Sequence, residues 1–131
     1  MLTVALLLAL GALALVQRGT RQHALLVGGL LVSIGLPLVV LARRQLGDAF
    51  AVTPQAKELV TRGLYARMPH PMYVFLDILL LGVIVMTRQA WPLVLWSGLV
   101  CVQAWQARRE TKVLERAFGD AYREYRKRTW W

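Results

Sequence analysis

Apolar residues occur in long unbroken blocks along the chain, and the charged residues gather between these blocks. A water-soluble domain of this size would instead space its apolar positions with a period of about 2 or about 3.6 residues. We interpret the blocks as membrane spans at residues 1–16, 24–42, 72–87 and 90–107. The pattern predicts an all-α polytopic membrane protein with about four transmembrane helices, forming a single membrane domain over residues 1–131.

The lengths and flanks of the blocks refine this prediction. The first and third blocks are shorter than the roughly 20 residues that a full span prefers, so we expect bilayer thinning or snorkelling at their ends. No Lys or Arg precedes the first block, which argues against a secretory signal. Only Arg88 and Gln89 separate the last two blocks, so these should form an antiparallel hairpin.

Residues 108–128, in the C-terminal tail, alternate charged residues with an apolar stripe at helical spacing. The stripe consists of Val113, Leu114, Ala117, Phe118, Ala121, Tyr122 and Tyr125. We expect a cytosolic amphipathic helix that continues the fourth block and is most easily interrupted at Gly119. A surface helix whose basic face meets anionic lipid is the alternative interpretation.

Positive charge is distributed unevenly between the connections. The chain carries 16 Lys and Arg against 7 Asp and Glu, a net charge of +9, although 57% of its residues are hydrophobic. The first and third connections hold only Arg18, Arg21 and Arg88, and the other positive residues lie in 43–71 and in the tail. The positive-inside rule therefore predicts that both termini and the connection 43–71 are cytosolic.

The same pattern argues against nucleic acid as a partner, because the positive residues flank apolar blocks and are not interleaved with aromatics on a soluble surface. Cys101, the single cysteine, lies within an apolar block, so the sequence contains no disulfide framework and no cysteine-rich metal site. Most of the tryptophans lie near predicted span ends, where we expect them to anchor the helices in the headgroup region. The tryptophans of the chain are Trp91, Trp96, Trp105, Trp130 and Trp131.

The connection 43–71 ends in a distinctive segment in which Pro69 and Pro71 bracket His70. The two prolines restrict the backbone at His70 and hold it extended where the third block begins. A fixed backbone of this kind suits contact with a ligand, although a lone histidine at a membrane interface also fits a structural role. His23, in the first connection, has no such context and is expected to be solvated.

Two blocks of residues stand out in the second half of the chain. The first block runs from Leu59 to Tyr65 and on into His70-Pro71-Met72-Tyr73, and the second is Arg109-Glu110 followed by Leu114, Phe118-Gly119, Tyr122 and Tyr125. Together they resemble the family of isoprenylcysteine carboxyl methyltransferases and phospholipid methyltransferases. The resemblance covers roughly residues 43–128. It implies an integral membrane enzyme that encloses S-adenosylmethionine on the cytosolic side, while a lipophilic or lipidated acceptor enters from the bilayer.

The resemblance also implies roles for individual residues. The expected cofactor-binding residues are Tyr65, His70, Pro71, Tyr73 and Glu110. Arg109 is the catalytic candidate, because its planar guanidinium can pair with an acceptor carboxylate or a lipid phosphate, although it also fits a positive-inside anchor. Attack of a carboxylate, amine or thiol on a sulfonium methyl requires no metal. The sequence does not decide between these acceptors.

The chain departs from the family pattern at three positions. Pro69 replaces an arginine, Phe75 replaces a glycine and Thr111 replaces the second residue of a Glu-Glu pair. These departures would also suit a non-catalytic relative that binds lipid or a partner helix. A reductase-like module is a further alternative, because sterol reductases share a similar C-terminal architecture.

Asp77 is the one acidic residue within the four predicted spans. An ionisable group at membrane depth is a functional candidate, and we expect Asp77 to face the cofactor cavity and pair with a basic residue; the alternative is that it reaches the headgroup region. The predicted partners are membrane lipid and a second copy of the chain, packed through the Gly-rich first and second spans. The compact length suggests the bacterial inner membrane.

Overall fold

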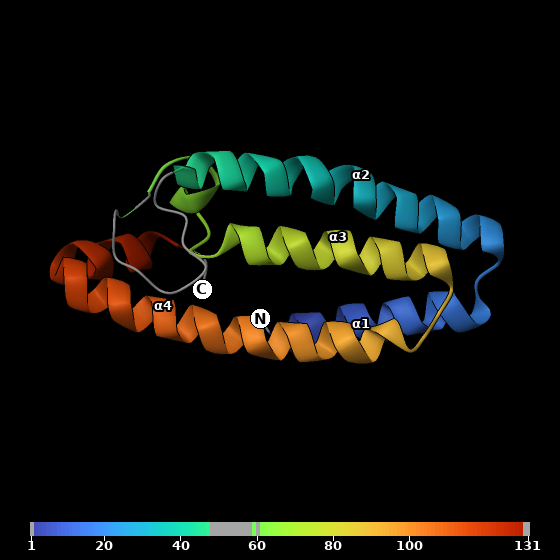
Figure 1. Cartoon of the computed structure of the whole chain (residues 1–131). Coiled ribbons are helices and arrows are strands. Elements are labelled where there is room, and N and C mark those ends of the chain that lie inside the picture. Colours follow the sequence, from blue (N-terminus) through green and yellow to red (C-terminus); the bar gives the residue numbers. More distant parts are fainter. Residues whose placement is uncertain (1, 48–58, 60, 130–131) are drawn as a thin grey trace.

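The structure is a computed structural model that describes residues 2–47, 59 and 61–129 (Figure 1). The described part of the chain forms four α-helices and one short 3-10 helix, and the all-α prediction is therefore confirmed. These elements are α1 (Leu2–Arg18), α2 (Arg21–Leu46), η2 (Gly63–Ala66), α3 (Pro71–Thr87) and α4 (Pro92–Arg128).

The helix boundaries differ from the apolar blocks mainly on the cytosolic side predicted from charge. Helix α2 continues through Pro37 and past Arg43 to Leu46, into the segment expected to be a connection. Helix α4 runs without a gap from the fourth block into the tail, as predicted, and its backbone leaves helical geometry at Gly119 (φ 51°, ψ −119°). Residues 48–58 and 60, half of the connection that remains between α2 and α3, lie outside the described residues.

Helices α2 and α3 pack closely because small residues line their interface. The buried residues of α2 are Ala24, Gly28, Gly35 and Ala42, which recur on one helical face. A Cβ atom on Gly28 would lie 2.6 Å from the carbonyl oxygen of Gly82 on α3, so the two backbones approach too closely for any side chain at that point. Such contacts between small residues are typical of helices that associate in membranes.

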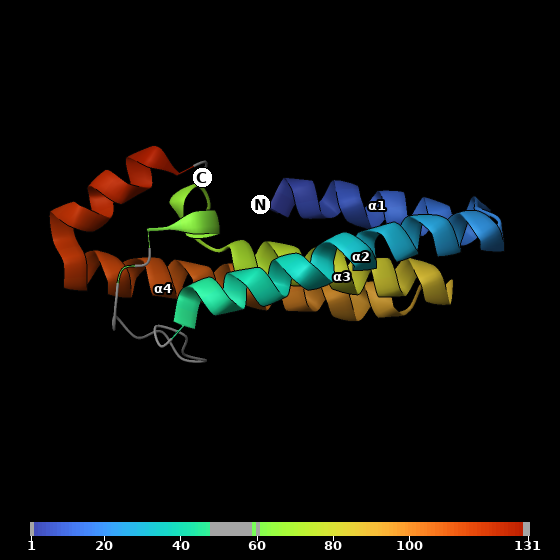
Figure 2. The same cartoon turned by 90° about the horizontal axis from the view of Figure 1, so that it is seen from above.

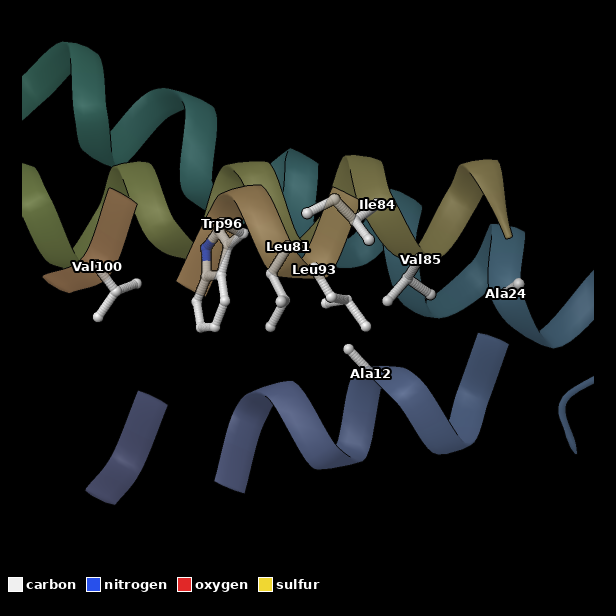
Figure 3. Packing of buried hydrophobic residues seen from close by; sticks show 8 residues of the cluster. All are labelled: Ala12, Ala24, Leu81, Ile84, Val85, Leu93, Trp96 and Val100. Atoms are coloured by element: carbon white, nitrogen blue, oxygen red, sulfur yellow. The ribbon is translucent and has the colours of Figure 1, made fainter. Parts of the chain in front are cut away.

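The main hydrophobic core lies between α1, α3 and α4, with Ala24 of α2 at its edge (Figure 3). Its buried residues are Ala12, Ala24, Leu81, Ile84, Val85, Leu93, Trp96 and Val100. Trp96 belongs to this core and does not have the anchoring role expected of most of the tryptophans, and Trp130 and Trp131 lie outside the described residues. The Trp96 indole is only 4% exposed and its Nε1 donates a hydrogen bond to the backbone oxygen of Asp77 at 3.3 Å, so it cross-links α4 to α3.

Large apolar side chains cover the outside of the bundle. Examples on α2 are Leu26, Leu30 and Leu36, each more than half exposed. Among the described residues, α2 is the one helix long and apolar enough to cross a membrane by length and composition, while the apolar helices α1 and α3 are shorter. Outward apolar faces and small inward residues are the arrangement expected of helices whose solvent is lipid.

The elements that carry the predicted site residues meet at one end of the bundle. Figures 1 and 2 show η2, the start of α3 and the last part of α4 together there, opposite the α1–α2 and α3–α4 connections. After Gly119 the last part of α4 turns back toward η2. Residues far apart in the sequence are thereby brought together.

Candidate functional site

His70 and Tyr73 are placed by the start of α3. Pro71 is the first residue of this helix, where a proline's fixed φ and missing N–H are well tolerated, and it is fully buried. His70 precedes it in a non-helical conformation (φ −132°, ψ 57°). The rings of His70 and Tyr73 then stack, with centroids 5.8 Å apart and planes 23° apart.

Glu110 of α4 joins these two side chains. Its Oε1 accepts a hydrogen bond from the Tyr73 hydroxyl at 2.5 Å, and its Oε2 lies 3.2 Å from Nδ1 of His70. The side-chain nitrogen of Gln106, one turn earlier on α4, lies 3.5 Å from Oε1. The His70 side chain is 10% exposed and that of Glu110 is 22% exposed, so the cluster is largely shielded but remains open to solvent.

Glu110 carries a negative charge at neutral pH. Burial raises the pKa of its carboxyl group, but hydrogen bonds from His70 and Tyr73 outweigh burial, and the net effect holds the pKa below its usual range. A carboxylate offers about four acceptor positions. The contacts with Tyr73, Gln106 and His70 fill three, so Glu110 retains capacity for one further donor.

Tyr65 lies in a second core beside this cluster. Its ring is buried with Ala42 of α2 and Phe75 of α3, and its backbone oxygen accepts a hydrogen bond from the Tyr125 hydroxyl at 2.7 Å. Burial, and next the charge of Glu110, raise the pKa of the Tyr65 hydroxyl. Burial also raises the pKa of Tyr125 to about 12, so both phenols stay protonated at neutral pH. The end of α4 is thus fastened onto η2.

Two of the three departures from the family pattern have structural partners. Phe75 points into the core shared by α2, η2 and α3, whereas Tyr73, two residues away, faces Glu110. The Thr111 hydroxyl accepts a hydrogen bond from the Tyr122 hydroxyl at 3.3 Å, which joins the two parts of α4 across the break at Gly119.

Arg109 does not join the cluster. It is exposed, and its guanidinium lies 4.6 Å from the ring centroid of Trp105 one turn earlier on α4. This cation–π contact suits a headgroup-level position, since both side chains combine an apolar body with a polar end. The catalytic role predicted for Arg109 remains a prediction.

Asp77 has a different partner from the expected one. With the Gln103 amide oriented so that its nitrogen faces the carboxylate, this nitrogen donates to Oδ2 at 2.9 Å and to Oδ1 at 3.1 Å. The prediction of a basic partner is therefore wrong, because a buried amide on α4 takes this place. His23, as expected, is exposed, and it contacts only Thr20 among the described side chains.

Three glutamines near the site were not predicted from the sequence. Gln103 and Gln106 lie on the face of α4 that also bears Glu110. Gln45 lies in the last turn of α2, beside η2. Oε1 of Gln45 accepts a hydrogen bond from the backbone nitrogen of Leu64 at 2.8 Å. The only available signal was that Gln106 and Gln103 lie four and seven residues before Glu110, and that Gln45 follows the end of an apolar block.

Gly63, the first residue of η2, lies directly against the Gln45 side chain. Its φ of 60° disfavours any side chain, and a Cβ atom there would come within 2.5 Å of the Gln45 side chain. We expect Gly63→Ala to lower stability by about 1–3 kcal/mol through backbone strain and loss of the Gln45 hydrogen bond. Gly47→Ala is the matched control, since Gly47 has a similar φ of 52° but open space around it. Equal losses of thermal stability in the two variants would show that Gln45 does not hold η2.

The fold and the site together define a class: an all-α, membrane-associated protein with a shielded acidic cluster at one end of its helical bundle. The model of the family described as phospholipid methyltransferase matches residues 23–121. The chain therefore belongs to the phospholipid methyltransferase family, which confirms the resemblance inferred from the sequence and identifies it as a membrane methyltransferase by family. No curated protein and no solved structure matches the chain.

Proposed function

We propose that the chain is an integral membrane enzyme that transfers a methyl group from S-adenosylmethionine to a lipophilic or membrane-associated acceptor at the cytosolic face. The observation that carries this proposal is the cluster in which Glu110 meets both His70 and Tyr73. These residues come from the two sequence blocks that resemble the family, and all lie within the matched range 23–121.

The chemistry of the cluster fits this cofactor. Glu110 is ionised and has an acceptor position left, which suits an ammonium group or a ribose hydroxyl. The stacked rings of His70 and Tyr73 form an aromatic surface beside it, which suits a planar base or a sulfonium cation. When bound, S-adenosylmethionine supplies an electrophilic methyl group, which an acceptor atom attacks while the thioether leaves. The residues present contribute positioning and exclusion of water.

We further propose that α1 to α4 all cross the membrane, with both termini cytosolic. The apolar outer faces of the helices support this placement, as does the concentration of Lys and Arg at the end that carries the site. In a bacterium this membrane would be the inner one. Tyr65 and Pro71 would then support the cofactor site from within the bundle, since both are buried.

Arg109 supports the acceptor side of the proposal. It stands one residue from Glu110 but on the exposed surface of α4, where a lipid phosphate or an acceptor carboxylate can reach it. The acceptor atom, whether in a carboxylate, an amine or a thiol, is left open by the residues at the site.

Equilibrium binding of S-adenosylmethionine to the detergent-purified protein tests the cofactor assignment. We expect saturable binding by the wild type, and weaker binding by Tyr73→Phe, which keeps the ring and removes the hydroxyl that donates to Glu110. The matched control is Tyr122→Phe, whose hydroxyl contacts Thr111 instead. A folded wild type that does not bind would overturn the proposal and favour a non-catalytic relative.

A further inference from the structure

A second polar pair repeats the geometry of the cluster two helical turns away. Asp77 of α3 lies seven residues after His70, which directly precedes α3, and Gln103 lies seven residues before Glu110 on α4. Because seven residues are about two helical turns, Gln103 lies on the same face of α4 as Glu110, and Asp77 lies about two turns along α3 from the level of His70. The pair Asp77–Gln103 thus follows from the pair His70–Glu110 in the antiparallel register of the two helices.

Together the two pairs form a polar column along the α3–α4 interface. Tyr73 and Gln106 lie between the two pairs: Tyr73 is three residues after His70, and Gln106 is four residues before Glu110. The column therefore runs from the end of the bundle into the apolar segment of α3. Trp96, seven residues before Gln103 on α4, donates a further hydrogen bond to the backbone oxygen of Asp77.

The contact between Asp77 and Gln103 depends on how α3 and α4 are aligned along their axes. Apolar side chains tolerate a slip by one turn, because one apolar contact replaces another. A slip would leave the Asp77 carboxylate without the Gln103 amide at a depth where an unpaired charge is costly. A single buried polar contact is known to fix the register of helices in this manner. The close glycine contact of Gly28 and Gly82 sets α2 against α3 but does not act on α4.

We propose that Asp77 and Gln103 are positioning residues, which fix the register of α4 against α3 and so hold Glu110 beside His70 and Tyr73. Neither residue touches the cofactor in this assignment. The effect of this pair on ligand binding rests on the proposed function, but the effect of the pair on helix register does not.

The test compares variants that keep or remove the contact. We expect Asp77→Leu and Gln103→Met each to weaken S-adenosylmethionine binding about tenfold, with kcat at saturating cofactor changed much less. Asp77→Asn retains an acceptor for the Gln103 amide and should bind within about twofold of wild type. The control is Leu81→Ala, which removes a buried side chain from the main core and should lower thermal stability without changing the dissociation constant.

A second readout needs no cofactor. Spin labels on the natural Cys101 of α4 and on Val83→Cys of α3, both exposed, report the register as a distance distribution. We expect Asp77→Leu and Gln103→Met to shift or broaden this distribution and Asp77→Asn to preserve it. If Asp77→Leu weakens binding while the distribution stays unchanged, Asp77 contacts the ligand directly and the positioning role is wrong.

The two readouts separate the two proposals. A wild type that fails to bind S-adenosylmethionine would overturn the proposed function, and the label distances would still decide the role of the pair. Unchanged distances in both Asp77→Leu and Gln103→Met would overturn the positioning role whatever the wild type binds.

Discussion

Replacing Glu110 by glutamine is expected to weaken S-adenosylmethionine binding by about 10- to 100-fold. The substitution preserves size but removes the charge, and its amide nitrogen cannot accept the hydrogen bonds that Tyr73 and His70 now share with the carboxylate. One of the two aromatic residues would therefore lose the acceptor that orients it. Isothermal titration calorimetry of the two proteins in the same detergent measures the effect.

The matched control is Glu115→Gln, on the same helix. Glu115 is exposed, and its carboxylate pairs with Arg123 at 3.5 Å on the surface. Exposed ion pairs contribute little, so this variant should bind like the wild type. Equal affinities for Glu110→Gln and the wild type would show that the carboxylate does not hold the cofactor.

Replacing Gly28 by alanine is expected to destabilise the protein by about 1–3 kcal/mol. The added methyl group would lie 2.6 Å from the Gly82 carbonyl oxygen and 3.1 Å from the backbone nitrogen of Met86, and neither atom can move unless α3 shifts. Because Tyr73 lies on α3 and His70 directly precedes this helix, cofactor binding should weaken together with stability. Thermal unfolding in detergent and the dissociation constant give the two readouts.

The adjacent Gly29 provides a control, because it lies on the same helix but faces away from α3. A Cβ atom on Gly29 has open space around it. Gly29→Ala should therefore be neutral or stabilise α2 by up to about 1 kcal/mol, since alanine is the better helix former. If the two alanine variants melt at the same temperature, the close contact of α2 with α3 is not what holds these helices together.

The helices could be predicted from the sequence because each apolar block is long and uninterrupted. Their ends could not, since a helix does not have to stop where its apolar block stops. Arg43 and Arg44 sit in the last turn of α2, where positive side chains interact favourably with the helix dipole, and the helix continues past them. The break at Gly119 was predictable, because glycine readily adopts a positive φ.

The site was predictable only in part. His70, Tyr73 and Glu110 were selected through family resemblance, and the structure brings them together. Periodicity alone could not have done so, because 37 residues separate Tyr73 from Glu110 along the chain. Trp96 and Asp77 were misjudged for a related reason. A residue type reveals its preferred depth in the membrane but not which neighbouring helix its side chain will face.

Transfer of a labelled methyl group from S-adenosylmethionine into the lipid fraction of membranes that contain the protein tests the proposed methyltransferase activity directly. We expect label in the organic extract with the wild type and Glu115→Gln, and its loss with Glu110→Gln. Wild-type protein that is folded and present in the membrane, but that leaves the lipid fraction and lipidated acceptors unlabelled, would contradict the proposed activity.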